Sequence, residues 1–305
     1  MGIMSQSKNR ILITGSNGLL GQTLTKHFIE NQIEFLATAN SENKISYCPD
    51  NDFRALNIQN KEQVKEVIQE FNPTHIINAA AMTNVDACED EVERCFGVNA
   101  TGVKNILEAI ENTEIHLIQI STDFIFDGQK KSYSEEDTAN PLSNYGKSKW
   151  DGEQIIFKSG FEKVTILRTS IVYGVGEKLN KGNIFNWSMQ ELRKGNQLKI
   201  VNDQFRTPTF VEDLVQACQK VINSNSFGVY NIAGGDLKSM FDYIILVAEY
   251  LKVDTDLVSA ITSKNLNQKA KRPISSGLII DKAKKGFDYN PTDFMVTLSK
   301  IDPEN

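Results

Sequence analysis

The sequence predicts an α/β protein built on a doubly wound parallel sheet, followed by a smaller C-terminal part. Short apolar stretches alternate with stretches of helical periodicity through the first half of the chain, and such alternation places helices on both faces of a parallel sheet. A glycine-rich turn separates the first strand from the first helix. The chain has 305 residues, 40% of them hydrophobic, which is enough to bury the core of such a sheet.

The first predicted unit is a strand, a turn and a helix. Residues 10–14 form an apolar run that ends at glycines, and residues 18–30 repeat apolar side chains at helical spacing. Pro141 marks the turn before a later helix. The alternation of strands and helices continues through residues 33–39, 61–71, 75–80, 90–110, 115–120, 142–157 and 163–168.

Composition and charge restrict the class of protein. The formal net charge of -6 opposes nucleic-acid binding, which needs clustered Lys and Arg. No apolar run has the length of a membrane span, and residues 1–10 are polar rather than signal-like. We therefore expect a cytoplasmic protein that contacts neither membrane nor nucleic acid. The spacing of the cysteines does not match that of zinc ligands, so we expect no metal site. We expect reduced, buried thiols at Cys48, Cys88, Cys95 and Cys218.

Three glycines, Gly15, Gly18 and Gly21, stand at the junction of the first strand and helix. A dinucleotide site needs a tight turn there, close approach of the backbone to the pyrophosphate, and phosphates at the helix N-terminus. The alternative is a plain structural turn. Because the triplet opens a βαβ unit, dinucleotide binding is the favoured interpretation.

This interpretation divides the chain into two parts. We expect a Rossmann-type nucleotide-binding domain at 1–170 and a substrate-binding part at 171–305. Strands of the second part should return to the main sheet, so that the two parts interleave. Beyond residue 170 the alternation loosens, and helical spacing recurs at residues 185–193, 211–222 and 239–251.

The end of the second strand bears on the choice of cofactor. A carboxylate there would bind the ribose 2′-hydroxyl of NADH, but residues 37–40 carry none, and Glu42 lies beyond them. Lys44 could reach a 2′-phosphate. NADPH is therefore the expected cofactor, with NADH also compatible. The alternative is that Thr38 and Lys44 are only a strand end and a solvated loop.

Tyr145 and Lys149 stand four residues apart and so share one face of the predicted helix. A phenol with an ordinary pKa of about 10 is a poor proton donor at neutral pH. We expect the Lys149 ammonium to lower the pKa of Tyr145, giving an acid that protonates the oxygen formed during hydride transfer. The same spacing occurs on ordinary amphipathic helices, and Lys147 is a nearby bystander.

Residues 120–123 strengthen this hypothesis, because they follow a predicted strand and precede the helix of Tyr145. Ligands bind at the carboxyl edge of a parallel sheet. A hydroxyl there can polarise a substrate carbonyl, a role we assign to Thr122 with Ser121 as the alternate. For Ser121 itself, capping the strand end is the favoured role.

Other polar residues predict structural roles. Residues 78–81 close the fourth strand with small side chains, as needed where the backbone approaches a cofactor. Asn99 is expected to be a structural hydrogen-bonding residue. Packing or surface positions are expected for His27, His75 and His116.

The chain resembles the extended short-chain dehydrogenases and, within them, the dTDP-4-dehydrorhamnose reductases and their relatives. The resemblance runs through most of the chain in family order. It is carried by residues 15–21, 73–81, 83–86, 121–128, 133–137, 145–149, 168–170, 203–204, 208–209 and 272–273.

The resemblance implies roles for individual residues. It implies catalysis by Thr122, Tyr145 and Lys149. The implied cofactor contacts are Gly15, Asn17, Gly18, Leu19, Leu20, Thr38, Asn57, Ile58, Ala79, Ala80, Ala81, Tyr145, Lys149 and Thr169. The implied substrate neighbours are Val85, Asp86, Thr122, Arg206 and Thr207.

Three positions depart from the family pattern. Asn57 stands where relatives often have an aspartate that contacts adenine, and Asn can make a similar bond. Ile171 replaces a frequent aromatic residue, and Arg206 occupies a position often given to glycine. Because the last two lie near the expected substrate pocket, the particular sugar nucleotide stays open.

These observations and the resemblance lead to one expected activity. It is the NADPH-dependent reduction of the 4-keto group of a deoxysugar nucleotide, dTDP-4-dehydro-L-rhamnose being the expected substrate and dTDP-L-rhamnose the product. One alternative is a nucleotide-sugar epimerase or dehydratase with tightly held NAD. Another is a regulatory subunit like the relative that associates with methionine adenosyltransferase. A homodimer could form through the helices at 90–110 and 142–157.

Overall fold

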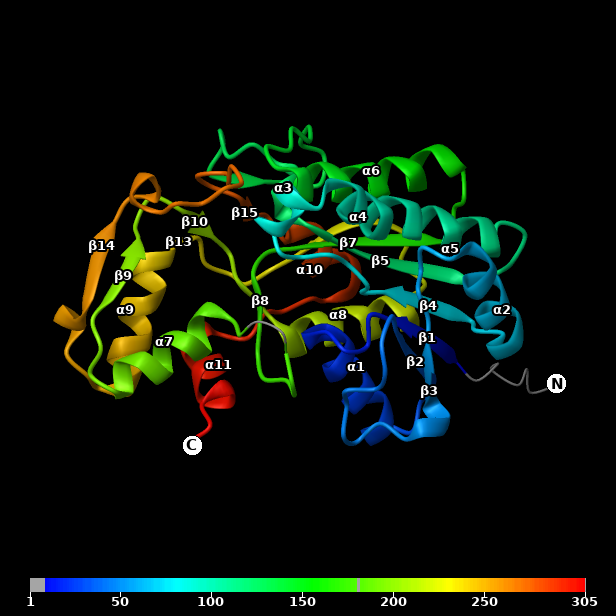
Figure 1. Ribbon diagram of the computed structural model, residues 1–305, viewed down its shortest axis with the longest axis horizontal. Helices are drawn as coiled ribbons and strands as arrows, with labels where there is room; N and C mark the ends of the chain where they lie inside the picture. Colours follow the sequence, from blue (N-terminus) through cyan, green and yellow to red (C-terminus); the bar gives the residue numbers. More distant parts are fainter. Residues whose placement is uncertain (1–8, 180–181, 305) are drawn as a thin grey trace.

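The computed structural model describes residues 9–179 and 182–304. Its centre is a seven-stranded sheet in the order β12-β7-β5-β4-β1-β2-β3, with every neighbouring pair parallel (Figure 1). The chain runs outward from β1 to β3 and then returns to β4 on the other side of β1. This reversal confirms the predicted doubly wound α/β topology. The strands are β1 (Arg10–Thr14), β2 (Glu34–Ala39), β3 (Phe53–Ala55), β4 (His75–Asn78), β5 (His116–Thr122), β7 (Val164–Thr169) and β12 (Gly228–Ile232).

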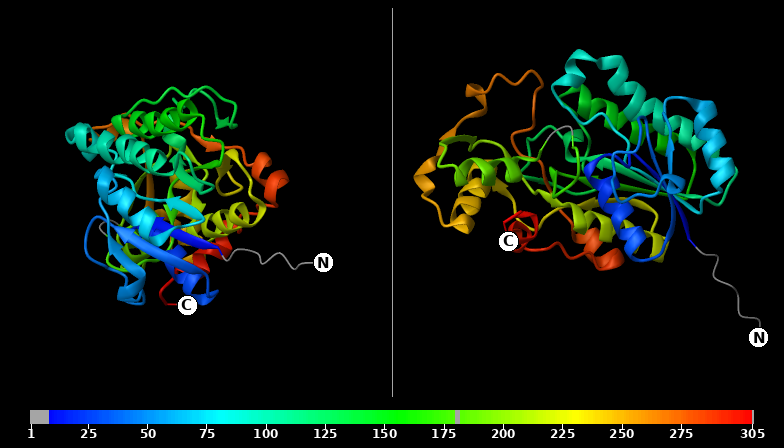
Figure 2. Two further views of the ribbon diagram at one scale, coloured as in Figure 1. Left: turned by 90° about the vertical axis from the view of Figure 1, so that its right-hand side faces the viewer. Right: turned by 60° about the horizontal axis from the view of Figure 1, so that its bottom comes forward.

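Two layers of helices bury the sheet on both faces. Ile11 and Ile13 of β1 belong to the core beneath one layer, and Leu12 belongs to the core beneath the other. This two-sided burial explains why the central strands read as unbroken apolar runs. The first layer holds α1 (Leu19–Glu30), α8 (Val211–Ser224) and α10 (Asp281–Phe287), and the second holds α2 (Lys61–Phe71), α5 (Gly102–Ile110) and α6 (Asn144–Ser159) (Figures 1 and 2).

The helix predicted at 90–110 is confirmed from Val92 onward, with a π-helical turn inside it. The segment consists of α3 (Ala87–Asp90), α4 (Val92–Phe96), a π-helical turn η2 (Gly97–Thr101) and α5. A Cβ atom on Gly97 would lie 2.1 Å from the end of the Gln59 side chain, so the π-helical turn passes close to the 57–60 loop. Such π-helical turns accommodate a local distortion within an otherwise α-helical stretch.

A third hydrophobic core lies in the C-terminal half of the chain. It packs α7 (Ile184–Arg193), α9 (Met240–Leu251) and α11 (Phe294–Ile301) against a two-stranded sheet of β9 (Leu198–Val201) and β14 (Val258–Ile261). Figure 1 shows this body at the end of the main sheet, opposite the N-terminus. The same half also supplies β12, which returns to the main sheet beside β7 as predicted.

Short strand pairs and turns complete the connection between the two bodies. The pairs are β6 (Ser132–Tyr133) with β15 (Gly277–Leu278), β8 (Val172–Tyr173) with β11 (Thr209–Phe210), and β10 (Phe205–Arg206) with β13 (Lys238–Ser239). The 3-10 turns are η1 (Asp50–Asp52), η3 (Asp123–Ile125), η4 (Thr255–Leu257) and η5 (Ser263–Asn265).

The four cysteines are buried free thiols, as predicted. Over the described ranges, no helix is both long and apolar enough to cross a membrane. Within the same ranges, we find no group of three or more His, Cys, Asp or Glu side chains that could hold a metal ion.

Two histidines confirm the prediction of packing roles. His75 of β4 and His116 of β5 are register partners, and their ring centroids lie 5.4 Å apart in the core. Burial lowers the pKa of His75 to about 4. Burial, with the nearby His75 and Lys163, lowers that of His116 to about 3. Both rings are therefore neutral in the folded protein near pH 7.

We expect this pair to make the folded state sensitive to acid. In the unfolded chain both rings titrate near pH 6.5, so the unfolded state binds more protons below that pH and stability falls as the pH drops toward 4. Between pH 7.5 and 5.5 the pair should remove about 2.5 kcal/mol from the free energy of unfolding in urea. The double variant His75→Gln/His116→Gln should lack this loss, whereas His27→Gln should keep it. An equal loss in the double variant would contradict the assignment.

Candidate active site

The glycine turn between β1 and α1 lies directly against the end of β4. Gly15 has a φ of +72°, and a Cβ atom there would lie 2.6 Å from the backbone of Ala80. Only glycine therefore fits, because both the left-handed backbone and the close approach exclude a side chain. The turn and residues 79–81 form one backbone-lined surface at the point where the strand order reverses.

The start of α1 suits an anionic ligand. Its N-cap is Gly18, no side chain caps the first turn, and that turn carries no acidic residue. Such a helix start presents backbone N–H groups and the positive end of the helix dipole. The residues present thus fit the phosphates of a dinucleotide. Leu20 points into the core, so of its atoms only the backbone can face this surface.

The loop after β2 is tied to the glycine turn through Asn17. The Asn17 amide donates to Ser41 Oγ at 3.1 Å and to the Glu42 carbonyl at 2.9 Å, and its oxygen accepts from the Lys44 N–H at 3.0 Å. Thr38 stays a predicted cofactor contact, although its side chain is engaged inside the protein. Its hydroxyl is fully buried and donates to the Ile13 carbonyl at 2.9 Å.

Residues 56–58 lie beside the end of β2, since the Leu56 N–H donates to the Ala39 carbonyl at 2.7 Å. Asn57 is exposed at this position, and its side-chain oxygen accepts from the Gln59 N–H at 3.0 Å. Ile58 is buried in the core. The structure therefore brings Asn57 to the expected edge of the sheet with its side chain engaged in its own loop.

Thr122, Tyr145 and Lys149 meet at the carboxyl end of β5. Ser143 caps α6 by accepting a hydrogen bond from the Gly146 N–H at 3.2 Å, which sets the helix start beside the strand end. The hydroxyls of Tyr145 and Thr122 are hydrogen-bonded. The Lys149 ammonium donates to the Ile120 carbonyl at 2.7 Å. Residues from a strand and a later helix thus form one polar cluster, as the sequence predicts.

The expected electrostatics of Tyr145 are wrong for the protein alone. Loss of solvation raises the pKa of Tyr145, the Asp123 carboxylate raises it further, and the interaction with the Thr122 side chain opposes this. The Lys149 ammonium is held by a backbone carbonyl, and its own pKa falls to about 8 through burial, with Glu153 opposing. Tyr145 is therefore a neutral phenol at pH 7, which is the form that can donate a proton.

Ser121 has a role that differs from both sequence hypotheses. Its hydroxyl donates to Glu153 Oε1 at 2.5 Å, and Glu153 pairs with Arg168 at 2.7 Å in the core. It therefore neither caps the strand end nor faces the cluster of Thr122. The pair Glu153–Arg168 links α6 to β7, and one remaining charge without its partner would be strongly destabilising.

The end of β7 completes the edge of the sheet. Thr169 is the register partner of Thr122, and its buried hydroxyl donates to Thr209 Oγ1 at 2.7 Å. The next residues are unusual, because Ile171 has a φ of +36°. A β-branched residue in the left-handed region is strained. The Thr209 N–H holds this backbone by donating to the carbonyls of Ser170 at 2.9 Å and Ile171 at 3.2 Å.

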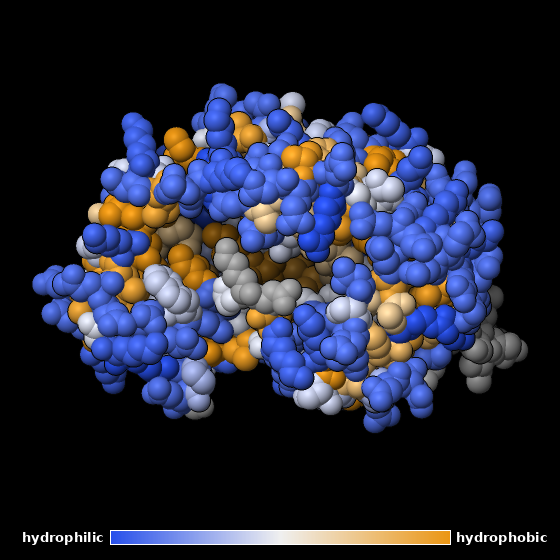
Figure 3. Space-filling view, viewed as in Figure 1, coloured by the Kyte–Doolittle hydropathy of each residue, from blue (hydrophilic) through white to orange (hydrophobic). Residues whose placement is uncertain are grey.

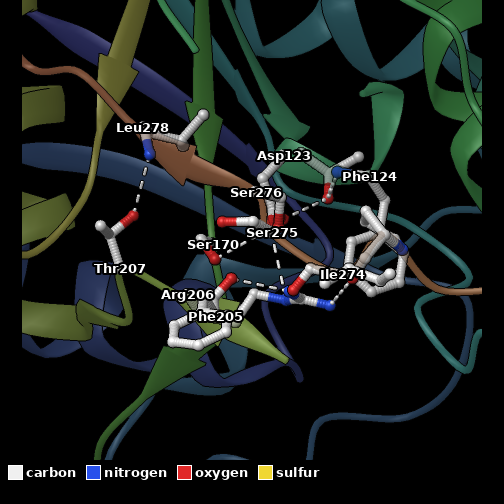
Figure 4. A network of polar contacts seen from close by, with 12 residues as sticks. Asp123, Phe124, Ser170, Phe205, Arg206, Thr207, Ile274, Ser275, Ser276 and Leu278 are labelled. Atoms are coloured by element: carbon white, nitrogen blue, oxygen red, sulfur yellow. Dashed lines mark hydrogen bonds and ion pairs between the residues drawn. The ribbon is translucent and has the colours of Figure 1, made fainter. Parts of the chain in front are cut away.

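The predicted substrate neighbours occupy two kinds of position. Val85 and Asp86 are partly exposed, and Asp86 accepts from Arg272 at 2.7 Å. Arg206 and Thr207 are instead 2% and 3% exposed. They stay predicted substrate neighbours, with side chains engaged inside the protein. Arg206 donates to three backbone carbonyls, and Thr207 Oγ1 accepts from the Leu278 N–H at 3.1 Å (Figure 4).

Sequence reasoning missed the buried carboxylate of Asp123. It follows Thr122 directly and accepts hydrogen bonds from Ser170 and Ser276. The motif around Thr122 already contains this acidic residue, yet its contacts come from segments 47 and 153 residues away.

Figure 3 shows that the surface is hollowed between the two bodies, with hydrophobic residues on the floor of the hollow.

The fold and this cluster define an oxidoreductase of the short-chain dehydrogenase type. Residues 9–302 match the family described as the RmlD substrate binding domain. The chain is 36% identical to a dTDP-4-dehydrorhamnose reductase from Aggregatibacter actinomycetemcomitans, covering 96% of this chain and 98% of that protein. The chain therefore belongs to the RmlD substrate binding domain family, and the resemblance seen in its motifs is confirmed.

Two further similarities bear on function. A crystal structure of a dTDP-4-dehydrorhamnose reductase from Bacillus anthracis in complex with NADP has a TM-score of 0.83 and 28% identity, covering 98% of this chain and 100% of that chain. The methionine adenosyltransferase 2 subunit beta of Xenopus laevis is 28% identical, over 84% of this chain and 76% of that protein.

The contact at Gly15 predicts an unusually damaging substitution. Gly15→Ala adds a Cβ against the β4 backbone and should lower the free energy of unfolding by more than about 2 kcal/mol. Gly160 is the matched control, with a φ of +69° and no atom within 4 Å of an added Cβ. Gly160→Ala should cost only about 1 kcal/mol from backbone strain. Equal losses in urea unfolding would show that the close approach has no energetic weight.

Proposed function

We propose that the protein reduces the 4-keto group of a deoxysugar nucleotide, with dTDP-4-dehydro-L-rhamnose as substrate, dTDP-L-rhamnose as product and NADPH as cofactor. The observation that carries this proposal is the meeting of Thr122, Tyr145 and Lys149 beside the glycine turn at the carboxyl edge of the sheet. The 36% identical relative named dTDP-4-dehydrorhamnose reductase supports it.

The proposed cofactor site uses the backbone-lined surface of the glycine turn. Gly15, Gly18 and residues 79–81 would contact the phosphates and the nicotinamide side, while the loop held by Asn17 would contact the adenosine side. The bound cofactor supplies the hydride. The preference for NADPH is supported by the absence of a carboxylate in residues 37–40 and by the NADP complex of the Bacillus anthracis reductase. NADH also fits the proposed site.

The protein's own groups would handle the carbonyl oxygen. Thr122 is proposed to donate a hydrogen bond to that oxygen, which polarises the carbonyl and stabilises the charge that develops there. Tyr145 gives its phenolic proton to the same oxygen. Lys149 lies one helical turn from Tyr145, so its charge favours the phenolate that remains after proton transfer.

The two bodies are proposed to divide the work. Residues 1–170 would hold the cofactor. Residues 171–305 would hold the sugar nucleotide, apart from β12 in the main sheet and α8 and α10 in its helix layer. Pairing of two chains through the helices at 90–110 and 142–157 stays a prediction. Val92 and Phe157 are exposed on these helices. Light scattering of the purified protein would give its mass.

A regulatory role is the second candidate function. The similarity to the methionine adenosyltransferase 2 subunit beta favours it. Absence of NADPH oxidation with every keto-sugar nucleotide tested, together with a stoichiometric complex with a methionine adenosyltransferase catalytic subunit, would support this role. An epimerase or dehydratase would instead release bound NAD on denaturation and consume no NADPH.

The proposed proton donor predicts a specific loss of turnover. Tyr145→Phe removes the hydroxyl and should lower kcat for a 4-keto sugar nucleotide by about 10²–10⁴-fold, measured as NADPH oxidation at 340 nm. NADPH binding, measured by fluorescence titration, should stay within about threefold, because the ring remains. Tyr250→Phe in α9 serves as the control. Full activity of the Tyr145 variant would reject this assignment.

The charge of Lys149 should limit catalytic activity at alkaline pH. Its ammonium is present below a pKa of about 8 and is lost above it, so kcat/KM should fall as the pH rises through about 8. Lys149→Arg keeps the charge and should move this fall to higher pH. Lys147→Met, an exposed neighbour on the same helix, should leave it in place. An unchanged pH profile in the arginine variant would assign the limit to another group.

A further inference from the structure

Arg206 is a charged side chain placed in the core between the two bodies. It comes from β10, and 2% of its surface is exposed. Its guanidinium donates to the carbonyls of Phe205 at 2.7 Å, Ile274 at 3.2 Å and Pro273 at 2.7 Å (Figure 4). These contacts give both terminal nitrogens hydrogen-bond acceptors, but neutral carbonyl groups do not neutralise the positive charge of the guanidinium. A buried cation needs a partner of opposite charge.

The partner is Asp123. Its carboxylate Oδ2 lies 4.0 Å from Arg206 Nε, and both side chains are 2% exposed. The same oxygen accepts from Ser170 Oγ at 3.0 Å and from the Ser276 hydroxyl. Figure 4 shows these groups converging on the turn after β5. Three segments of the chain therefore stabilise one carboxylate.

The other oxygen of this carboxylate contacts the proposed active site. Thr122 Oγ1 donates to Asp123 Oδ1 at 3.2 Å and accepts from the Phe124 N–H at 3.2 Å. A threonine hydroxyl has one proton, so it cannot serve the carboxylate and a substrate carbonyl at once. The stronger the negative charge on Asp123, the more firmly it retains that proton, because hydrogen bonds to ionised acceptors are the stronger ones.

We propose that Arg206 is a positioning residue that balances the charge of Asp123 and thereby leaves the Thr122 proton available to the substrate carbonyl. This inference rests on the proposed reductase function and deepens it. Arg206 touches neither of the groups that react. It acts through Asp123, from the connection between the two bodies, and thus couples the packing of residues 273–276 to the proposed active site.

Few other ionisable groups face this pair. Tyr145 of α6 senses the charge of Asp123. Arg272, in the segment that packs on Arg206, is the other cation that Arg206 senses, and it is paired with Asp86. Burial raises the pKa of Asp123, whereas Arg206 and the three hydroxyl groups of Ser276, Ser170 and Thr122 oppose this.

The direct test is a titration of the Asp123 carboxyl carbon by ¹³C NMR in the full chain, assigned with Asp123→Asn. Arg206→Gln removes the charge and should move the titration midpoint up by about 1–3 pH units. Arg206→Lys should leave it near the wild-type midpoint. Arg272→Met is the matched control for loss of an arginine. It should shift the Asp123 titration midpoint by only a small fraction of the shift caused by Arg206→Gln. An unmoved midpoint in Arg206→Gln overturns the proposal.

Kinetics test the consequence for Thr122. Arg206→Gln should lower kcat by about 10–100-fold with NADPH binding unchanged, and the loss should be greatest at a pH where the Asp123 carboxyl is ionised. Arg206→Gln/Asp123→Asn should recover at least about tenfold, since no unbalanced charge remains. In a Thr122→Val background, Arg206→Gln should add no further loss. Additive losses, or no recovery in the double variant, would assign Arg206 a merely structural role.

The outcomes separate this inference from the proposed function. If the wild-type protein oxidises no NADPH with any keto-sugar nucleotide, the proposed function fails, and the NMR titration alone decides whether Arg206 controls Asp123. If Arg206→Gln does not fold, the comparison of Arg206→Lys with Arg206→Gln/Asp123→Asn takes its place. A double variant that also fails to fold would contradict the charge-balance argument, because its core contains no unpaired charge.

Discussion

The contact between the backbone of Gly15 and that of residues 79–80 is the constraint on which the rest of the structure depends. It brings the ends of β1 and β4 together without any intervening side chain, where the strand order reverses. A ligand at this point meets main-chain N–H groups and a helix start rather than flexible side chains. The position of α1, and through Asn17 that of the loop after β2, follows from the same contact.

A second constraint joins the two bodies at Asp123. Ser170 lies at the end of β7, Ser276 precedes β15, and Arg206 belongs to β10, yet all three converge on one carboxylate. Burying a charge is unfavourable unless all its bonding capacity is used. The network therefore specifies the relative placement of distant segments more strictly than apolar packing would, because an apolar surface tolerates small displacements.

Much of the fold could be predicted from the sequence because strands buried on both faces and helices with one apolar face leave distinct patterns. The meeting of Thr122, Tyr145 and Lys149 followed from the same topology. The π-helical turn at Gly97–Thr101 could not be predicted, because the helical spacing of apolar residues continues through the segment. Desolvation is also invisible in a sequence: Tyr145 has a raised pKa and Arg206 is buried, although their residue types suggest an activated phenol and an exposed cation.

The strained backbone at Ile171 has a mechanical consequence. The φ of +36° at a β-branched residue is flanked by hydrogen bonds to Thr209: its N–H is shared between the Ser170 and Ile171 carbonyls, and its hydroxyl oxygen accepts from the Ser170 N–H at 3.3 Å. Rotation of one body relative to the other about this peptide would have to break these hydrogen bonds. The connection from β7 to β8 therefore resists rotation between the two bodies. The same hydrogen bonds keep β8 beside β11, so the position of the second body relative to the main sheet is tied to the end of β7.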